Sequence, residues 1–591
     1  MGPPVLFDFE DAIHKVMIEK AQDLHRLRHS AAHILAQAVR RLWPQTRLAI
    51  GPPIEEGFYY DLDLPQPITD EDLPKIEAEM KKIIDADLPF KQSWMGRQEA
   101  LDFFGTKGER FKQEIIREIQ DEKVSIYTDG EFMDLCEGPH MASTGQVKAV
   151  KLLSLAGAYW RGDERNPQLT RIYGTAFFDK KELEEFLKRR EEAKKRDHRK
   201  LGQELRLFSI LEEAGAGLVF YQPKGAVVRQ LIESYSRQEH ARRGYVPVLT
   251  PHVLRSDIWV RSGHYDHYKP NMYMFKVEEQ EWGIKPMNCP GHILIYQTAL
   301  HSYRELPLRF FELGTVYRNE KSGVLHGLLR VRGFTQDDSH IFCRPSQLES
   351  ELSGVLDFIR SAMSDFGFRE YKIELSTRPP EFMGDESQWI RAEEVLKRVL
   401  ESQKVPYQLS PGAGAFYGPK IDVHVKDTLG RYWQCATAQL DYVLPQRFGL
   451  RYAEENGQEA QPVMIHRAIF GSLERFLGTL IEHYGGAFPV WLAPVQAVVI
   501  PVTPAQESYA GQVGTVLADA GIRVETDSRK ERFQAKIRDA ELNKIPYMLV
   551  VGQREADSGQ VSVRSKNTGD QGAVTVEEFL SRITEEIKNK V

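Results

Sequence analysis

Cysteine is scarce in this 591-residue chain, which has four cysteines at widely separated positions. So few residues cannot build the disulfide framework of a small secreted protein, and a reducing cytoplasm is the expected location. No apolar run approaches the roughly 20 residues of a membrane helix, so no membrane partner is expected. Residues 1–15 turn acidic early and lack the apolar core of a signal peptide. The remaining composition, 41 % hydrophobic and 28 % charged, is typical of a globular protein.

A strong excess of one charge is missing too, because 78 Lys and Arg residues face 85 Asp and Glu residues, a net charge of −7. This balance gives no indication of a nucleic-acid partner, although net charge says little about local patches. Two basic segments stand out, at 187–200 and 529–538. The first is either a solvated face of a charged helix or a track for a phosphate backbone, and the sequence leaves both interpretations open.

The length predicts roughly three to five domains. Hydrophobic patterns divide the chain into three domains and one connector. An α+β block covers 1–178, and a charged helix over 179–206 connects it to the largest block, 207–490, which mixes amphipathic helices with strands. Alternating strands and helices over 491–591 predict a small α/β domain with a largely parallel sheet.

Within the first block, apolar residues at helical spacing predict a long helix over 11–43, which Pro44 ends. Residues 57–64 alternate as a strand does. Shorter helices are expected at 70–86 and 107–121.

The Gly-rich loop of the commonest nucleotide-binding site is absent from the large block. Four segments offer other phosphate chemistry: a helix with a following strand, two strands and a final helix, at 223–251, 309–320, 328–340 and 471–484. Arg318 and Glu320 lie near the end of the first of the two strands, Arg330 lies on the second, and Arg475 lies in the first turns of the last helix. A guanidinium is planar and permanently charged, which suits it to bring two anions together.

Histidines and cysteines form two further patterns. His29 and His33 are four residues apart on the predicted helix and share a face, and Cys136 and His140 are also four apart. Taken alone, this is either a four-ligand zinc site or a helix-face histidine pair with a core cysteine. Cys289 has no ligand-like spacing to other residues, so by itself it would be a small buried side chain.

Six segments occur in a fixed order: RHSAAH, YTDGEFMDLCEGPH, KPMNCPGH, RGFTQDDSHIF, QLDY and PVMIHRAIFGSLERF. Together with the layout of domains, they resemble the threonyl-tRNA synthetases, a class II aminoacyl-tRNA synthetase family, over almost the whole chain. The resemblance implies an N-terminal α+β editing domain, a central antiparallel-sheet catalytic domain and a C-terminal α/β anticodon-binding domain. It also implies a homodimer that activates L-threonine with ATP and transfers it to tRNA(Thr).

By this resemblance, Arg318 holds the α-phosphate and the activated carboxylate, Arg475 lies by the adenine and the γ-phosphate, and Glu320 lies near the adenine or the metal–phosphate cluster. Magnesium ions would accompany ATP and neutralise the leaving pyrophosphate. Asp338 would receive the substrate amine. The other expected catalytic-pocket residues are Gln336, Gln439, Tyr417 and Lys420.

The resemblance also makes Cys289, His340 and His466 the ligands of one zinc ion per subunit, whose open position takes the threonine amine and hydroxyl. A site built for the hydroxyl rejects valine, but serine differs by one methyl, which is worth only about 10–200-fold. A second, hydrolytic site for seryl-tRNA is therefore expected. The family's editing pocket maps onto His29, His33, Cys136 and His140, with Asp134, Lys112 and Tyr60 in support; whether it holds metal or an ordered water stays open.

In the C-terminal domain, four residues match positions that contact anticodon bases: Lys530, Arg538, Glu555 and Arg564. One departure from bacterial relatives is expected, since only a short lead precedes the helix with the editing histidines, so the small N-terminal ubiquitin-like domain is missing by lineage or by trimming. Two alternatives are another class II synthetase, such as a prolyl or seryl type, and a non-catalytic tRNA-binding paralogue. The set of Cys289, His340 and His466 argues against the first. Retention of Arg318, Glu320 and Arg475 argues against the second.

Overall fold

The computed structural model describes residues 8–566 and 568–590. The start of the N-terminal segment considered above for a signal peptide lies outside these residues. The chain divides into two compact units, 1–191 and 192–591, and each is described by itself. None of the helices in the described ranges combines the length and apolarity that a membrane span requires.

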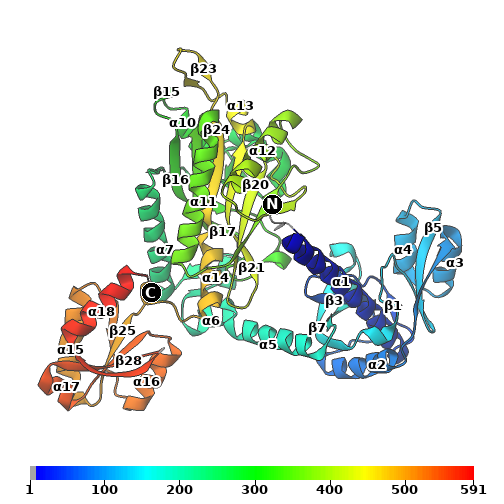
Figure 1. Ribbon diagram of the computed structural model, residues 1–591, viewed down its shortest axis with the longest axis horizontal. Helices are drawn as coiled ribbons and strands as arrows, with labels where there is room; N and C mark the ends of the chain where they lie inside the picture. Colours follow the sequence, from blue (N-terminus) through cyan, green and yellow to red (C-terminus); the bar gives the residue numbers. More distant parts are fainter. Residues whose placement is uncertain (1–7, 567, 591) are drawn as a thin grey trace, which may run out of the picture. The chain divides into compact units, whose positions relative to one another are not determined.

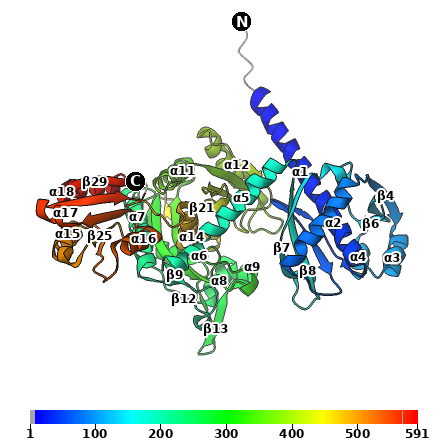
Figure 2. The ribbon, with the colours of Figure 1, turned by 90° about the horizontal axis from the view of Figure 1, so that it is seen from below.

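In the N-terminal unit, the long helix α1 (Asp8–Leu42) and helix α2 (Leu73–Asp85) pack together against a five-stranded sheet (Figure 2). The core between them includes Leu27, Ile34 and Leu35, which follow helical spacing, as predicted. The strands of this sheet are β1 (Arg47–Leu48), β2 (Pro53–Ile54), β3 (Gly57–Asp63), β7 (Ala149–Tyr159) and β8 (Gln168–Phe177). The predicted helix 11–43 and strand 57–64 are thus confirmed.

A smaller three-stranded sheet completes this unit. Its strands are β4 (Phe90–Gly96), β5 (Lys123–Asp129) and β6 (Phe132–Leu135), covered by helices α3 (Arg97–Thr106) and α4 (Arg110–Glu118). Helix α4 lies within the predicted 107–121, whereas α3 was not predicted.

The connector is two helices, not the single helix predicted over 179–206. Helix α5 (Lys180–Arg196) ends before Asp197, which has non-helical backbone angles (φ −50°, ψ 120°) and caps helix α6 (His198–Glu204) by accepting the Arg199 N–H. A carboxylate in this position satisfies a free helix N–H, so a helix begins anew there. Along α5 only Phe186 is buried, which leaves both interpretations of its basic residues open.

The main body of the second unit is an eight-stranded sheet in the order β11-β16-β17-β24-β21-β20-β18-β19 (Figure 1). The bounds are β11 (Val246–Pro247), β16 (Leu308–Tyr317), β17 (Gly333–Cys343), β24 (Val463–Ser472), β21 (Tyr432–Asp441), β20 (Lys420–Lys426), β18 (Tyr371–Ser376) and β19 (Gln408–Ser410). Every inner pairing is antiparallel, and only the two edge pairs are parallel. The predicted antiparallel catalytic sheet is confirmed.

Alternation along these strands separates a packed face from a functional face. Ile341, Ile465 and Leu440 join the largest hydrophobic core together with side chains of helices α11 (Leu348–Asp365) and α12 (Glu386–Ser402). The neighbouring residues His340 and His466 point to the opposite face. Other helices of this body are α7 (Pro223–Arg242), α8 (Ser256–Ser262), α9 (His264–Tyr268), α10 (Cys289–Tyr296), α13 (Val443–Arg447) and α14 (Leu473–Tyr484).

Two strand predictions in this body need correction. The second predicted strand, 328–340, begins only at Gly333, so Arg330 lies in the loop before it. The strand expected to continue to Pro251 is only the two-residue β11. In both places the residues before or after the strand are held by loop contacts, such as the hydrogen bond from the His326 N–H to the Arg330 carbonyl.

The C-terminal sheet has the order β26-β25-β27-β28-β29 and is mixed, not largely parallel as predicted. Its strands are β25 (Ala497–Pro501), β26 (Val524–Thr526), β27 (Tyr547–Val551), β28 (Gln560–Ser565) and β29 (Gly569–Thr575), and its helices are α15 (Glu507–Asp519), α16 (Phe533–Leu542), α17 (Gln553–Ser558) and α18 (Val576–Lys588). The last two strand pairings are antiparallel. Strand β29 was missed because its Gly-rich sequence has little apolar alternation.

Candidate functional site

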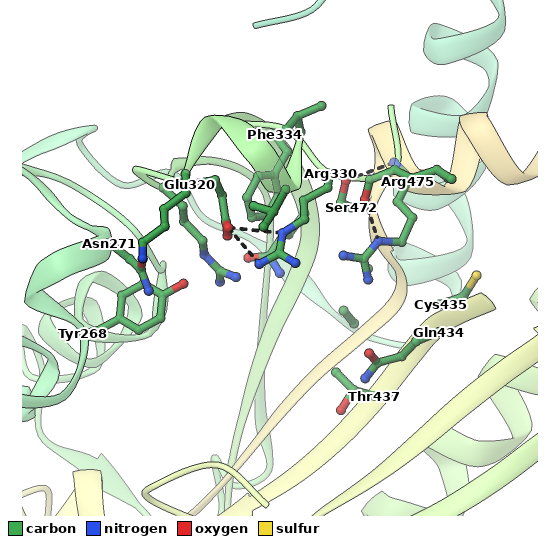
Figure 3. A pocket seen from close by; sticks show the side chains of 18 residues that line it. Tyr268, Asn271, Glu320, Arg330, Phe334, Gln434, Cys435, Thr437, Ser472 and Arg475 are labelled. Atoms are coloured by element: carbon green, nitrogen blue, oxygen red, sulfur yellow. Dashed lines mark hydrogen bonds and ion pairs between the residues drawn. The ribbon is translucent and has the colours of Figure 1, made fainter. Parts of the chain in front are cut away.

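A cavity of about 630 Å³ opens on the functional face of the eight-stranded sheet (Figure 3). Arg318 and Glu320 reach it from the end of β16, Gln336 from β17, and Arg475 from the first turn of α14. The structure therefore brings together four of the predicted catalytic residues. The Ser472 side chain caps α14 by accepting the Arg475 N–H, which fixes the start of this helix in the cavity wall.

The two predicted arginines of the cavity lie against neutral groups. Arg318 lies over the rings of Phe334 and Tyr268, at 5.0 and 5.5 Å from their centroids, and Arg475 Nε donates to the Leu329 carbonyl at 3.2 Å. Burial lowers the pKa of Arg475. Neither arginine forms an ion pair with a carboxylate in the described ranges, so both charges are available to an anionic ligand.

Arg330 behaves differently, because it pairs with Glu320, another residue of the cavity lining, at 2.9 Å (Figure 3). Sequence reasoning named Arg330 but gave it no role. It also missed several lining residues, of which Phe334 lies inside a quoted motif and the others have no sequence signal: Tyr268, Asn271, Lys321, Gln434 and Thr437. Cys435 also lines the cavity, whereas Cys343 is fully buried in the core.

Cys289, His340 and His466 come together further along the same face. Their ligand atoms all lie within 4.8 Å of one another, and all three side chains are buried. His340 on β17 and His466 on β24 are direct partners across the two strands, with His340 Nε2 at 3.0 Å from His466 Nδ1. Cys289 approaches from the first position of α10. Strand register and a helix start thus assemble ligands that are far apart in sequence.

This donor set fits a zinc ion. One thiol and two imidazoles are the ligands that zinc prefers, and tetrahedral zinc holds such atoms about 3.3–3.7 Å apart. His466 Nε2 lies 2.8 Å from Asp441 Oδ2, while Asp441 Oδ1 accepts the N–H groups of Val443 and Leu444. A carboxylate behind a histidine is the common outer partner of a metal ligand. Burial raises the pKa of the Cys289 thiol well above its usual range, a cost that a cation would offset.

The remaining predicted pocket residues differ in position. Asp338 Oδ1 lies 3.8 Å from His340 Nε2, so it lies at the cluster, and the Tyr417 hydroxyl donates to Gln439 at 3.0 Å with its ring 5.0 Å from that of His466. Burial raises the pKa of Asp338. Lys420 instead forms an ion pair with Asp422 at 2.7 Å, although it is the strand partner of Gln439.

His264 and Asn288 are two of the cluster neighbours that sequence reasoning missed. His264, which is fully buried, has its Nε2 at 4.0 Å from Cys289 Sγ, and the amide of Asn288 donates to Asp338 at 3.0 Å. Asn288 stands next to Cys289 in a quoted motif, but His264 has no sequence pattern to reveal it.

In the N-terminal unit, a second cavity of about 650 Å³ is lined by the predicted editing residues except His140, which contacts Cys136 beside it. Cys136 Sγ lies 3.2 Å from both His29 Nε2 and His140 Nε2, and the ring of His33 is 4.2 Å from that of His140. All four ligand atoms lie within 4.8 Å of one another. The four-residue spacing on α1 thus brings both His29 and His33 to Cys136, which follows the end of β6.

A buried polar chain supports this quartet. Lys112 forms an ion pair with Asp134 at 2.6 Å, and the Tyr60 hydroxyl donates to the same carboxylate at 2.5 Å. All three residues line the cavity, as predicted. Burial lowers the pKa of His29 to about 4 and raises the pKa of the Cys136 thiol to about 12, so both side chains are neutral near pH 7.

A third cluster, Asp197, His198 and Glu482, has no free ligand. His198 Nδ1 contacts Glu482 at 2.6 Å, and its Nε2 accepts the Leu328 N–H at 3.0 Å. Because both ring nitrogens are used, this histidine ties the connector helix to the loop of the first cavity.

The predicted anticodon contacts lie apart on the C-terminal domain. Lys530 and Arg538 are exposed on and beside α16, and Arg564 lies on β28. Glu555 differs, since its two oxygens accept the Gly552 N–H at 2.9 Å and the Ser562 hydroxyl at 2.8 Å. A partner for Glu555 would compete with these local bonds.

Three parts of the chain match known families. Residues 124–173 match the threonyl and alanyl tRNA synthetase second additional domain, and residues 273–484 match the tRNA synthetase class II core domain (G, H, P, S and T). Residues 496–586 match an anticodon-binding domain.

Curated relatives match over nearly the full chain. A threonine–tRNA ligase of Oleidesulfovibrio alaskensis is 54 % identical, with 97 % of this chain and 89 % of the relative covered. One of Syntrophomonas wolfei is 53 % identical, with 99 % and 91 % covered. Among solved structures, the RNA-binding domain of threonyl-tRNA synthetase from Cryptosporidium parvum is 41 % identical with a TM-score of 0.64, covering 66 % of this chain and 98 % of that one. A prolyl-tRNA synthetase from the same organism is 17 % identical (TM-score 0.54, 66 % and 77 % covered), a likeness of fold alone.

Proposed function

Because the chain belongs to the threonine–tRNA ligase family, we propose that its three sites divide the work of charging tRNA(Thr). The cavity of the main sheet binds ATP, the Cys289 cluster selects threonine, and the N-terminal cavity removes serine. The observation that carries this proposal is β17, where Gln336 in the first cavity and His340 in the cluster lie four residues apart on one face. That is about 13 Å along a strand, a span that an aminoacyl-adenylate can bridge.

In the first cavity, Arg318 and Arg475 are half-buried cations without carboxylate partners in the described part of the chain, which suits them to a triphosphate. Arg318 bridges the α-phosphate and the attacking carboxylate, and Arg475 holds the far end of ATP. Glu320 takes the metal–phosphate side, with magnesium supplied with ATP. Such a reaction needs positioning and charge more than covalent help.

For amino-acid selection, the residues that would hold zinc are Cys289, His340 and His466. When bound, zinc would supply a Lewis acid whose open side can take the amine and hydroxyl of threonine. Asp338 accepts an N–H of the substrate amine, and Gln439 with Tyr417 closes the side of the pocket. Valine, which lacks the hydroxyl, leaves this polar site unpaired and is rejected.

In the N-terminal cavity, the neutral quartet of His29, His33, Cys136 and His140 positions the water that hydrolyses seryl-tRNA, and the Lys112–Asp134 pair fixes its wall. The match of residues 124–173 to a domain of threonyl and alanyl synthetases supports this role.

Contacts with tRNA are proposed for two basic regions, 187–200 and 529–538, and for Lys530, Arg538, Glu555 and Arg564 as readers of the anticodon. A homodimer is supported by the short edge strand β11, where Val246 and the following Leu249 are exposed, the latter at 86 %. We further propose a cytoplasmic location and domain bounds of 1–178, 179–206, 207–490 and 491–591.

ATP–pyrophosphate exchange with a panel of amino acids tests the proposal. Threonine should support exchange, serine should support it more weakly, and valine and proline should not. Exchange with proline alone would favour another class II specificity, and no exchange with any amino acid would indicate a non-catalytic tRNA-binding protein.

A further inference from the structure

His292 lies directly behind His340 in the Cys289 cluster. It follows Cys289 by three residues on α10, so both side chains leave the same side of that helix. His292 is completely buried, and its Nδ1 lies 2.7 Å from Nδ1 of His340. At this distance one of the two nitrogens must donate and the other must accept.

Glu312 determines which nitrogen donates. Its Oε2 lies 3.1 Å from Nε2 of His292, and its Oε1 accepts the Thr250 N–H at 3.0 Å and faces Lys285 Nζ at 3.2 Å. Burial alone would raise the pKa of Glu312, but hydrogen bonds from His292 and Thr250 lower it to about 2. This ionised carboxylate can only accept, so Nε2 of His292 carries a proton. In a neutral imidazole with its proton on Nε2, Nδ1 carries a lone pair and can only accept.

The hydrogen-bond direction then passes to the cluster. His340 must donate from Nδ1, which leaves its Nε2 unprotonated and pointing at His466 Nδ1, 3.0 Å away. Asp441 has the same effect on His466, because its carboxylate accepts a hydrogen bond from Nε2 and so leaves Nδ1 unprotonated. Two lone pairs face each other at hydrogen-bond distance, an arrangement that repels unless a cation joins them.

We propose that His292, oriented by Glu312, is a positioning residue that holds His340 in its metal-binding tautomer. This inference rests on the metal site proposed above and adds a second layer to it. Outer partners of this kind typically contribute 10–100-fold to metal affinity.

Zinc affinity of the full-length chain, measured by competition with a chelator, tests the role directly. His292→Leu removes the acceptor, and we expect the zinc dissociation constant to rise about 10–100-fold. His292→Asn can place its side-chain oxygen where Nδ1 was, so it should retain most of the affinity. Binding of Co²⁺ gives an independent readout, since its visible absorption reports whether coordination stays tetrahedral.

Glu312→Gln tests the hydrogen-bond chain from Glu312 through His292 to His340, because the substitution leaves His292 and the three cluster residues unchanged. The Thr250 N–H and the Lys285 ammonium hold the oxygen of the new amide on their side, so its NH₂ faces His292. His292 would then accept at Nε2 and donate from Nδ1, which turns His340 into the wrong tautomer. We expect a loss of zinc affinity of about 10-fold, within the range for an outer partner.

His240→Gln is the matched control, because His240 is equally buried in the same body and contacts Ser236 and Arg467 but no cluster residue. It should bind zinc as the wild type does. If His292→Leu and Glu312→Gln both keep wild-type affinity, the positioning role is wrong. Should His292→Leu not fold, wild-type affinity in Glu312→Gln alone has the same consequence. If the wild type itself binds no zinc and Cys289→Ser changes nothing, the metal site proposed above fails, a result distinct from unchanged affinity in the variants alone.

Discussion

The two His/Cys clusters of this chain have similar side chains but different surroundings. In the Cys289 cluster, the second nitrogen of each histidine is engaged, by Asp441 behind His466 and by His292 behind His340. In the N-terminal quartet, Nδ1 of His33 is buried without a partner in the described ranges. The nearest carboxylate, Asp134, is already paired with Lys112.

This difference separates a site prepared for a metal from one prepared for water. Fixed tautomers and carboxylates raise the basicity of ligands and hold them in place. A quartet kept neutral by burial, beside a lysine–aspartate pair, provides polar groups for a substrate and water without that support. We therefore expect zinc at the Cys289 cluster and an ordered water at the quartet.

Cys289→Ser should break the comparison most strongly. Loss of a direct ligand should lower the zinc affinity by more than the upper limit of about 100-fold that is typical for an outer partner. Threonine-dependent ATP–pyrophosphate exchange and bound zinc should fall together, whereas hydrolysis of pre-made seryl-tRNA should continue at the wild-type rate. Cys343→Ser, which changes a core cysteine outside both sites, is the control. Normal exchange in Cys289→Ser would remove the metal from the proposed mechanism.

The converse change is the double substitution His29→Ala and His33→Ala. Threonine activation should be unchanged, but hydrolysis of seryl-tRNA should fall about 100-fold or more, the lower range for loss of acid–base groups. Seryl-tRNA(Thr) should then accumulate when the enzyme is given serine. Absence of the mischarged product would place editing elsewhere in the chain.

The sequence predicted the members of both clusters but not their surroundings. His29 and His33 follow helical spacing, and His340 and His466 lie in motifs with strand alternation, so local pattern and resemblance were sufficient. His292 and Glu312 depend on which strand face meets α10, which is a tertiary property. Tertiary contacts also explain two differences from the predicted elements. The side chain of Asp197 caps α6 and so divides the predicted connector helix, and a loop contact of Arg330 keeps it out of the strand that the sequence pattern predicted.

Asp441→Asn should produce an intermediate effect on the metal side. The N–H groups of Val443 and Leu444 hold the remaining oxygen, so the new NH₂ faces His466 Nε2 and favours the wrong tautomer. Zinc affinity should fall about 10–100-fold, and KM for threonine should rise. The control is Asp427→Asn, since Asp427 is buried in the same body and accepts the Leu429 N–H, the Trp433 ring N–H and the Arg431 guanidinium, away from the cluster. Equal effects of both substitutions would indicate a loss of stability alone.

The smallest expected effect is a pH dependence confined to the quartet. Burial lowers the pKa of His29 from 6.5 to about 4 in the folded chain. Between pH 6.5 and about 4, the unfolded chain binds a proton at His29 and the folded chain does not. The free energy of unfolding is therefore highest, as far as His29 is concerned, above pH 6.5, and it decreases as pH falls towards 4. The hydrogen-exchange protection factors of α1 in the full-length protein should fall over this range, and His29→Gln should flatten the change. A metal bound at the quartet would compete with protons for the ring nitrogens and would protect α1 when Zn²⁺ is added. If the quartet holds water instead, addition of Zn²⁺ should leave the exchange of α1 unchanged.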